Sequence, residues 1–219
     1  MQKKNSELTA YEQIRKAILL KKLLPGQRLT EQWLGENLKM SRTPVRAALK
    51  KLEEERLVEM IANRGAFVYK PDMKEIKDVF DVRILLESYA AKMSADHIEE
   101  TDLGKLYLLL EEEKKSYREK NFEKFINVNS EIHLMPALIT KNKILIQQVR
   151  SLIYWSNCYI ILKDPFYERS VDTAMNIPEH EIIVQALEAQ DGRAAEKAVK
   201  KHLNTTLKSL DDPVSIFDV

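Results

Sequence analysis

The feature that most constrains this chain is an almost unbroken helical pattern over its C-terminal two thirds. From Met73 to about Leu210 nearly every segment has helical periodicity, interrupted at short polar breaks. The 219 residues include five Gly and seven Pro, which disfavours a disordered or turn-rich all-β chain. We therefore predict a mainly α protein in which residues 72–219 form an all-α bundle of six or seven helices. The breaks are expected near Glu100-Thr101, Lys120-Asn121, Lys141-Asn142, Lys163-Asp164-Pro165, Ile177-Pro178 and Asp191-Gly192.

Residues 1–71 have a different organisation. Helices are expected over about 7–22, 31–38 and 42–55, and the last two are joined by about three residues. Two β-rich runs, 57–61 and 66–69, flank a turn that contains Gly65 and predict a hairpin. A helix-turn-helix followed by a hairpin predicts a winged-helix domain. Its inward-facing residues should be Trp33, Leu34, Leu38, Val45, Ala48, Leu49 and Leu52.

The formal net charge of +1 conceals an asymmetry. Residues 1–71 contain 15 Lys and Arg against 8 Asp and Glu, a net charge of +7. The remaining residues contain 20 basic and 26 acidic side chains, a net charge of −6. A basic N-terminal third joined to an acidic remainder indicates a module that binds a polyanion.

The expected third helix begins Ser41-Arg42-Thr43-Pro44-Val45-Arg46. Pro is tolerated in the first turn of a helix, and Arg42 and Arg46 share one face because they are four residues apart. Two cations near the positive end of a helix dipole are unfavourable unless an anion compensates them. This arrangement favours binding to a DNA phosphate or a guanine edge. The alternative is a solvated helix start with two ordinary surface arginines.

This segment resembles the DNA-binding domain of GntR-type bacterial repressors. The resemblance rests on Pro25-Gly26-Gln27-Arg28-Leu29, Leu34, Leu38, the run 41–49, Leu52, Leu57-Val58 and Gly65. It implies a homodimer on a palindromic double-stranded DNA operator, with a winged helix from each subunit. The residues that it assigns to DNA are Gln32, Arg42, Thr43 and Arg46 at the major groove and Arg64 and Gly65 at the minor groove. The chain departs from the family at Ala47, where Glu is usual, and at 53–56, where Glu-Gly or Asp-Gly is commoner.

The chain has four histidines, His97, His133, His180 and His202. Asn129 and His133 share a helix face, and the last two histidines lie on later helices. Imidazoles from three helices that converge inside a bundle can hold a transition metal. By spacing alone, histidines packed in the core or exposed at the surface are the more common outcome.

The segment after Met73 resembles the FCD ligand-binding domain of the FadR subfamily of GntR-type regulators. The resemblance rests on 82–87, 129–133, Glu179-His180, Ala186-Leu187, Asp191-Gly192, Ala195 and His202-Leu203. It implies a divalent metal held by Asn129, His133, His180 and His202, with Zn²⁺ as first choice and Ni²⁺ or Mn²⁺ if the site is octahedral. The family more often has Asp at position 129. With Asn there, we expect weaker metal binding and stronger attraction of an anionic effector.

The resemblance also implies a small organic acid as effector, bound at open metal positions. Arg83 is a candidate clamp for its carboxylate, although a surface pair with Glu87 is equally compatible. Arg150, Tyr154 and Asn157 are further effector-binding candidates, with plain packing as the alternative. The sequence thus predicts a transcriptional regulator, a repressor, whose operator binding responds to the effector. A metal-free regulator of the same family stays open.

A zinc-dependent hydrolase fused to a DNA-binding domain is the other alternative. It is disfavoured because Glu131 points away from the face that carries His133 and no nucleophile–base pair is evident, so we expect no enzyme. The single cysteine, Cys158, is consistent with a reducing compartment. The N-terminal residues show no signal peptide, and the apolar window 144–162 is too polar for a membrane span. A cytoplasmic protein without membrane association is expected.

Overall fold

The computed structural model describes the backbone of residues 2–211 and the side chains of residues 6–211. The chain divides into two compact units, residues 1–71 and 72–219. The predicted fold class, a winged helix-turn-helix followed by an all-α bundle, is confirmed over the described residues.

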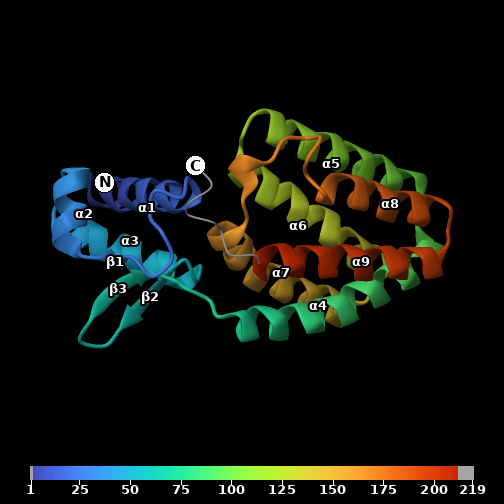
Figure 1. Cartoon of the computed structure of the whole chain (residues 1–219), viewed down its shortest axis with the longest axis horizontal. Coiled ribbons are helices and arrows are strands. Elements are labelled where there is room, and N and C mark those ends of the chain that lie inside the picture. Colours follow the sequence, from blue (N-terminus) through green and yellow to red (C-terminus); the bar gives the residue numbers. More distant parts are fainter. Residues whose placement is uncertain (1, 212–219) are drawn as a thin grey trace. The chain divides into compact units, whose positions relative to one another are not determined.

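The N-terminal unit is a three-helix core with a small antiparallel sheet (Figure 1). Its sheet has the strand order β1-β3-β2, with Arg28 opposite Phe67 and Met60 opposite Ala66. The strand β1, which pairs with the hairpin, was not expected from the sequence because two residues are too few to show periodicity. The elements are α1 (Gln2–Leu19), β1 (Arg28–Leu29), α2 (Glu31–Leu38), α3 (Arg42–Glu54), β2 (Val58–Ile61) and β3 (Gly65–Val68).

Local sequence explains the helix-turn-helix. The Thr30 side chain accepts a hydrogen bond from the backbone N–H of Trp33, as an N-cap does. Lys39 ends α2 in a left-handed conformation with φ 54°, and α3 begins three residues later. The face of α3 that was expected to point inward, Val45, Ala48, Leu49 and Leu52, is fully buried.

One local expectation for this unit was wrong. Trp33 is 42% exposed rather than inward, because the short helix α2 buries only the side that carries Leu34.

The ends of α3 show two further local features. Ser41 occupies the N-cap position of α3, but its side chain makes no capping hydrogen bond. Arg56 lies in the left-handed region with φ 58°, where Gly has no steric penalty. This position explains the Gly that is commoner in the family.

The C-terminal unit is a bundle of six α-helices and two short 3₁₀ turns within residues 72–211. In Figure 1, α4 runs beside α7 and α9, and α5 packs on α6 and α8. The helices are α4 (Met73–Ser94), α5 (Glu100–Arg118), α6 (Phe122–Ile139), α7 (Lys143–Lys163), α8 (Asn176–Glu188) and α9 (Gly192–Asp211). The break expected near Ile177-Pro178 ends slightly earlier, because α8 begins at Asn176 and Pro178 lies in its first turn, where its missing N–H costs no helical hydrogen bond.

An aromatic cluster anchors the connection between α7 and α8. Phe166, fully buried on the 3₁₀ turn Phe166–Glu168, has its ring centroid 4.7 Å from those of both Tyr117 and Phe122. Lys120 donates hydrogen bonds to the backbone oxygens of Tyr167 and Arg169. The connection is therefore held against α5 and α6. None of the described helices is both long and apolar enough to cross a membrane.

Candidate functional site

Three buried histidines meet inside the helical bundle. His133 on α6, His180 on α8 and His202 on α9 are 7%, 0% and 2% exposed. The Nε2 atom of His202 lies 3.2 Å from Nε2 of His180 and 3.2 Å from Nε2 of His133. Nitrogens that ligate one cation at about 2.0–2.1 Å are separated by roughly 2.8–3.0 Å in an octahedral site and by roughly 3.3–3.4 Å in a tetrahedral site. The cluster therefore has the spacing of a three-histidine metal site.

Each of these histidines is held from behind by a different buried carboxylate. Nδ1 of His133 lies 2.7 Å from Oε2 of Glu87, and Nδ1 of His180 lies 2.9 Å from Oε2 of Glu113. Nδ1 of His202 lies 3.0 Å from Oε2 of Glu179. A carboxylate accepts the Nδ1–H, so the neutral ring presents the lone pair of Nε2. Three such lone pairs face one another, which is unfavourable without a cation between them.

The electrostatics of the cluster support neutral imidazoles. Burial lowers the pKa of His133 and, together with the neighbouring His180 and His133, lowers the pKa of His202 well below its ordinary value. Burial raises the pKa of Glu87, but Arg83 and His133 outweigh it and leave that pKa below its ordinary value.

The buried charges of the cluster do not cancel by themselves. Arg83 is 1% exposed and donates to Glu87 from Nε at 2.6 Å and from Nη2 at 3.3 Å. Three carboxylates, Glu87, Glu113 and Glu179, against this one guanidinium leave two negative charges uncompensated when the imidazoles are neutral. A bound divalent cation would neutralise them and remove the cost of burying unpaired charge.

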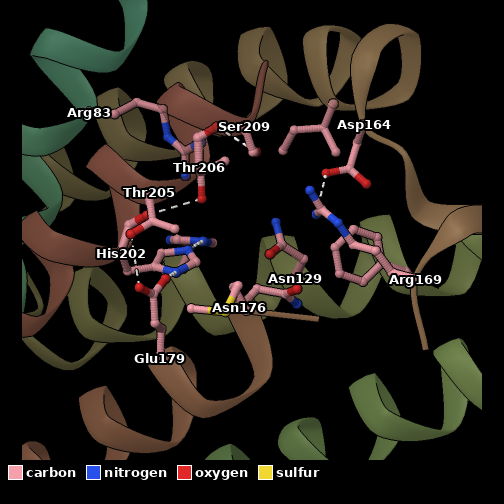
Figure 2. A pocket seen from close by; sticks show the side chains of 14 residues that line it. Arg83, Asn129, Asp164, Arg169, Asn176, Glu179, His202, Thr205, Thr206 and Ser209 are labelled. Atoms are coloured by element: carbon pink, nitrogen blue, oxygen red, sulfur yellow. Dashed lines mark hydrogen bonds and ion pairs between the residues drawn. The ribbon is translucent and has the colours of Figure 1, made fainter. Parts of the chain in front are cut away.

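A cavity of about 70 Å³ opens beside the histidines. Asn129 is 5% exposed, faces this space in Figure 2, and its side chain has no hydrogen-bond partner among residues 6–211. It lies one helical turn from His133, so its amide oxygen is available as a fourth ligand. The cavity is lined by Arg83, Phe125, Asn129, His133, Ile160, Asp164, Arg169, Met175, Asn176, Glu179, His202, Thr205, Thr206 and Ser209.

The winged helix has a separate arginine-rich surface. Arg42, Thr43 and Arg46 are all exposed on the first turns of α3. Arg46 donates to Glu31 of α2 from Nε at 2.6 Å and from Nη2 at 2.7 Å. This hydrogen-bonded pair lowers the pKa of Glu31 and raises the pKa of Arg46.

A groove of about 260 Å³ lies between α3 and the hairpin. Gln32, Arg42, Arg64 and Gly65 line it, and Arg42 Nη2 is 3.5 Å from the Gln32 side-chain oxygen. Arg28 on β1 lines the same groove and was not singled out from the sequence. Its position follows from the unexpected strand, which places it opposite Phe67 of the hairpin.

Comparison with known proteins assigns each of the two units to a protein family. The bacterial regulatory protein family gntR matches residues 7–68, and the FCD domain matches residues 78–205, more than half of the chain. The chain belongs to the GntR family and carries an FCD domain. It is a DNA-binding transcriptional regulator and not an enzyme, which removes the hydrolase alternative.

The relatives of this GntR regulator span nearly its whole length. It is 26% identical over 201 residues to the uncharacterized HTH-type transcriptional regulator YdhC of Bacillus subtilis, covering 90% of this chain and 87% of that protein. It is 24% identical to the HTH-type transcriptional repressor RspR of Escherichia coli, covering 91% and 86%. A putative GntR regulator from Rhodococcus sp. RHA1 has the same fold, with a TM-score of 0.68, 22% identity and coverage of 93% and 96%.

Of the four residues predicted to bind the effector in the FCD domain, one lines the cavity and three do not. Arg83 lines the cavity and pairs with Glu87, but this pair is buried rather than at the surface, and the role of Arg83 as a clamp stays a prediction. Arg150 and Tyr154 are exposed, and Asn157 donates to Ser130, so these three lie outside the described lining. The reason is the rotation of α7 about its axis, which turns Ile160 and, at its C-terminal cap, Asp164 toward the cavity.

Sequence reasoning missed several residues of this FCD domain. Thr205, Thr206 and Ser209 follow His202 at helical spacing, and Glu179 is adjacent to His180. Their positions relative to the two histidines could therefore have indicated that they lie near the site. Arg169 and Asp164 lie in the irregular α7–α8 connection, where no periodicity indicates which side chains point inward. His97 is exposed and stands apart from the histidine cluster, as expected.

Proposed function

We propose that this GntR regulator is a repressor whose operator binding is controlled by a small carboxylate at a divalent metal in the FCD domain. The observation that carries the proposal is the convergence of three imidazoles, each backed by its own carboxylate. Asn129, His133, His180 and His202 would hold the ion. When bound, the metal would supply open coordination positions for the effector, with Arg83 at the side of the cavity.

Zn²⁺ is the first candidate for the ion, because imidazole ligands suit it; with Asn129 as the fourth ligand, an effector carboxylate would displace Asn129 or add a fifth ligand. Ni²⁺ or Mn²⁺ would fit if Asn129 and two small ligands complete an octahedron. The charge balance favours a divalent ion over a metal-free cavity in which the histidines contact the effector directly. A metal-free FCD domain would have to bury two uncompensated negative charges.

Metal analysis of protein purified without a nickel column tests this part. We expect about one divalent ion per chain and its loss when His133, His180 and His202 are all replaced by Ala. The exposed His97→Ala is the matched control and should retain the ion. Stoichiometric metal in the triple variant would refute the site, and a metal-free wild-type protein would favour the metal-free alternative.

For DNA binding we propose Gln32, Arg42, Thr43 and Arg46 at the major groove and Arg64 and Gly65 at the minor groove. The exposure of α3 and the shared groove with the hairpin support this assignment. Arg46→Ala should weaken binding to an operator selected from random DNA by about 1–3 kcal/mol, roughly 5- to 150-fold. Fluorescence anisotropy measures this change, and unaltered affinity would refute the role of Arg46.

A homodimer is the oligomer we propose, because winged helices bind palindromic operators as two-fold pairs. The exposed apolar residues of α4, Val82, Leu85, Tyr89 and Met93, recur at helical spacing and are 44%, 66%, 50% and 39% exposed. A second copy of this chain would cover them. Leu85→Glu should convert a dimer to a monomer by light scattering, whereas the exposed Leu108→Glu on α5 should not. Such a regulator would act in the cytoplasm.

A further inference from the structure

We propose that the cavity takes a hydroxylated dicarboxylate, and that Arg169 binds the carboxylate farther from the histidines. This inference rests on the proposed function, namely that the cavity takes a carboxylate at all. It adds a second cationic anchor for the ligand, Arg169, and a cavity wall whose oxygens accept hydrogen bonds from ligand hydroxyl groups.

The first observation is the placement of Arg169. Its backbone oxygen accepts a hydrogen bond from Lys120, and the preceding Phe166 is locked in the aromatic cluster. The side chain is thereby directed from the α7–α8 connection toward the cavity that it lines (Figure 2). A connection that is pinned at two points holds a guanidinium in place before a ligand arrives, which reduces the entropy lost on binding.

The second observation is the bonding capacity that Arg169 retains. A guanidinium has five N–H groups, and the one from Nη1 reaches Oδ2 of Asp164 at 3.3 Å. No other hydrogen bond from this guanidinium is made within residues 6–211. Most of its donors are therefore available, and the fork geometry of a guanidinium matches a carboxylate.

The two arginines of the cavity lie on opposite sides of it in Figure 2. Arg83 stands near the histidine cluster and uses three N–H groups on Glu87 and Ser156. A ligand carboxylate between Arg83, Asn129 and the metal would satisfy one end of the cavity. The other end is Arg169, whose single hydrogen bond to Asp164 leaves most of its donors open to a second carboxylate of the ligand.

The third observation concerns the wall that α9 supplies. The Thr206 hydroxyl donates to the backbone oxygen of His202 at 3.1 Å, and the Ser209 hydroxyl donates to that of Thr206 at 2.8 Å. The Thr205 hydroxyl donates to Glu179 Oε1 at 2.9 Å. While its hydrogen is used in this way, each of these oxygens keeps lone pairs that can accept a hydrogen bond from a ligand. A ligand hydroxyl donates to such a wall, while a carboxylate or a methylene does not.

Size and charge restrict the ligand further. A cavity of about 70 Å³ admits a short acid rather than a long chain. Asp164 and Glu179 also line it, but the first bonds Arg169 and the second bonds His202 and Thr205. The cavity therefore combines two anion-binding ends with an accepting wall between them, which describes a short dicarboxylate that carries hydroxyl groups.

The test compares four-carbon acids that differ by one group, by calorimetry on the metal-loaded full chain. Malate and tartrate carry both features, succinate lacks the hydroxyl, and 3-hydroxybutyrate lacks the second carboxylate. We expect malate or tartrate to bind about tenfold or more tightly than 3-hydroxybutyrate, because a charge-assisted pair is lost. We expect several-fold weaker binding of succinate.

Variants identify the residues. Arg169→Gln should abolish the preference for the dicarboxylate and leave 3-hydroxybutyrate unchanged, while the exposed Arg193→Gln should alter neither. Thr206→Val should reduce the preference for malate over succinate. Equal binding of the mono- and dicarboxylates, or an equal loss of both in Arg169→Gln, would overturn the role of Arg169 and leave a carboxylate effector standing. If none of the acids binds or alters operator affinity, the inference and the carboxylate effector fail together.

Discussion

His180 Nδ1 and Glu113 Oε2 lie 2.9 Å apart with both side chains fully buried. Glu113 belongs to α5, which was not expected to contribute to the histidine cluster. Its carboxylate fixes the ring of His180 and supplies part of the negative charge that a cation would balance. The proposed metal site thus has a buried carboxylate behind each of its three imidazoles.

Glu113→Gln should reduce metal affinity by about 10- to 100-fold, because a neutral amide makes the imidazole a weaker ligand. A fluorescent chelator in competition measures the affinity. The same variant removes a buried charge, so the metal-free protein should be no less stable than the wild type. Glu112→Gln, which alters the neighbouring carboxylate that pairs with Lys124, is the control. Parallel loss of stability and affinity would indicate a merely structural role.

Asn129→Asp should tighten metal binding and weaken carboxylate binding. An anionic oxygen is a stronger ligand than an amide, and the added negative charge opposes an anionic effector. Isothermal titration measures both affinities. Asn204→Asp on the exposed side of α9 adds the same charge away from the cavity and should leave both affinities unchanged. Unchanged or weaker metal binding in Asn129→Asp would contradict the ligand role of this residue.

The metal-free protein should lose stability as the pH falls below about 7. The pKa values of His133 and His202 in the folded protein are below the ordinary value of 6.5. Between the pKa of each histidine in the folded protein and its pKa in the unfolded chain, the unfolded chain therefore binds more protons. The free energy of unfolding then decreases by up to about 1.4 kcal/mol per pH unit for each histidine. The lowered pKa of Glu87 acts in the same direction below about pH 4.5.

Urea unfolding in a chelating buffer between pH 8 and pH 5 measures this dependence. His97→Ala should retain the slope, because His97 is exposed. The triple histidine variant should flatten it. A stability that stays constant or rises on acidification would show that the cluster is protonated in the folded protein.

Glu31→Gln should raise affinity for non-specific DNA several-fold and reduce the preference for the operator. The carboxylate of Glu31 holds Arg46 through two hydrogen bonds and opposes DNA phosphates on the same surface. Its removal frees the guanidinium to contact any phosphate. Fluorescence anisotropy over a range of salt concentrations measures the change, and Glu12→Gln on α1 controls for net charge. A preserved ratio of operator to non-specific affinity would refute a positioning role.

Gly192→Ala and Gly104→Ala should change stability in opposite directions. A Cβ at Gly192 would lie 2.7 Å from the backbone oxygen of Lys92, so α9 must shift from α4 at a cost of about 1–3 kcal/mol. A Cβ at Gly104 on α5 meets nothing within 4 Å, and Ala there should stabilise the helix by about 0.5–1 kcal/mol. Chemical denaturation measures both, and equal effects would contradict the close packing at Gly192.

Much of the fold could be predicted because it depends on local signals. The buried face of α3 follows from four apolar residues at helical spacing, and the start of α2 follows from the capping preference of Thr30. The resemblance to known regulators supplied Asn129 and the three histidines as candidates. Spacing alone could not have selected them, because a shared helix face does not show which other helix lies opposite.

The helices, the wing, the charge asymmetry and the family of the chain follow from short stretches of neighbouring residues. The packing of the bundle adds that Glu87, Glu113 and Glu179 each support a histidine, and that Arg169 enters the cavity while Arg150 and Tyr154 do not. These outcomes depend on how helices rotate against one another and on where an irregular connection is anchored. Packing over the whole bundle sets both, and no short stretch of sequence contains that information.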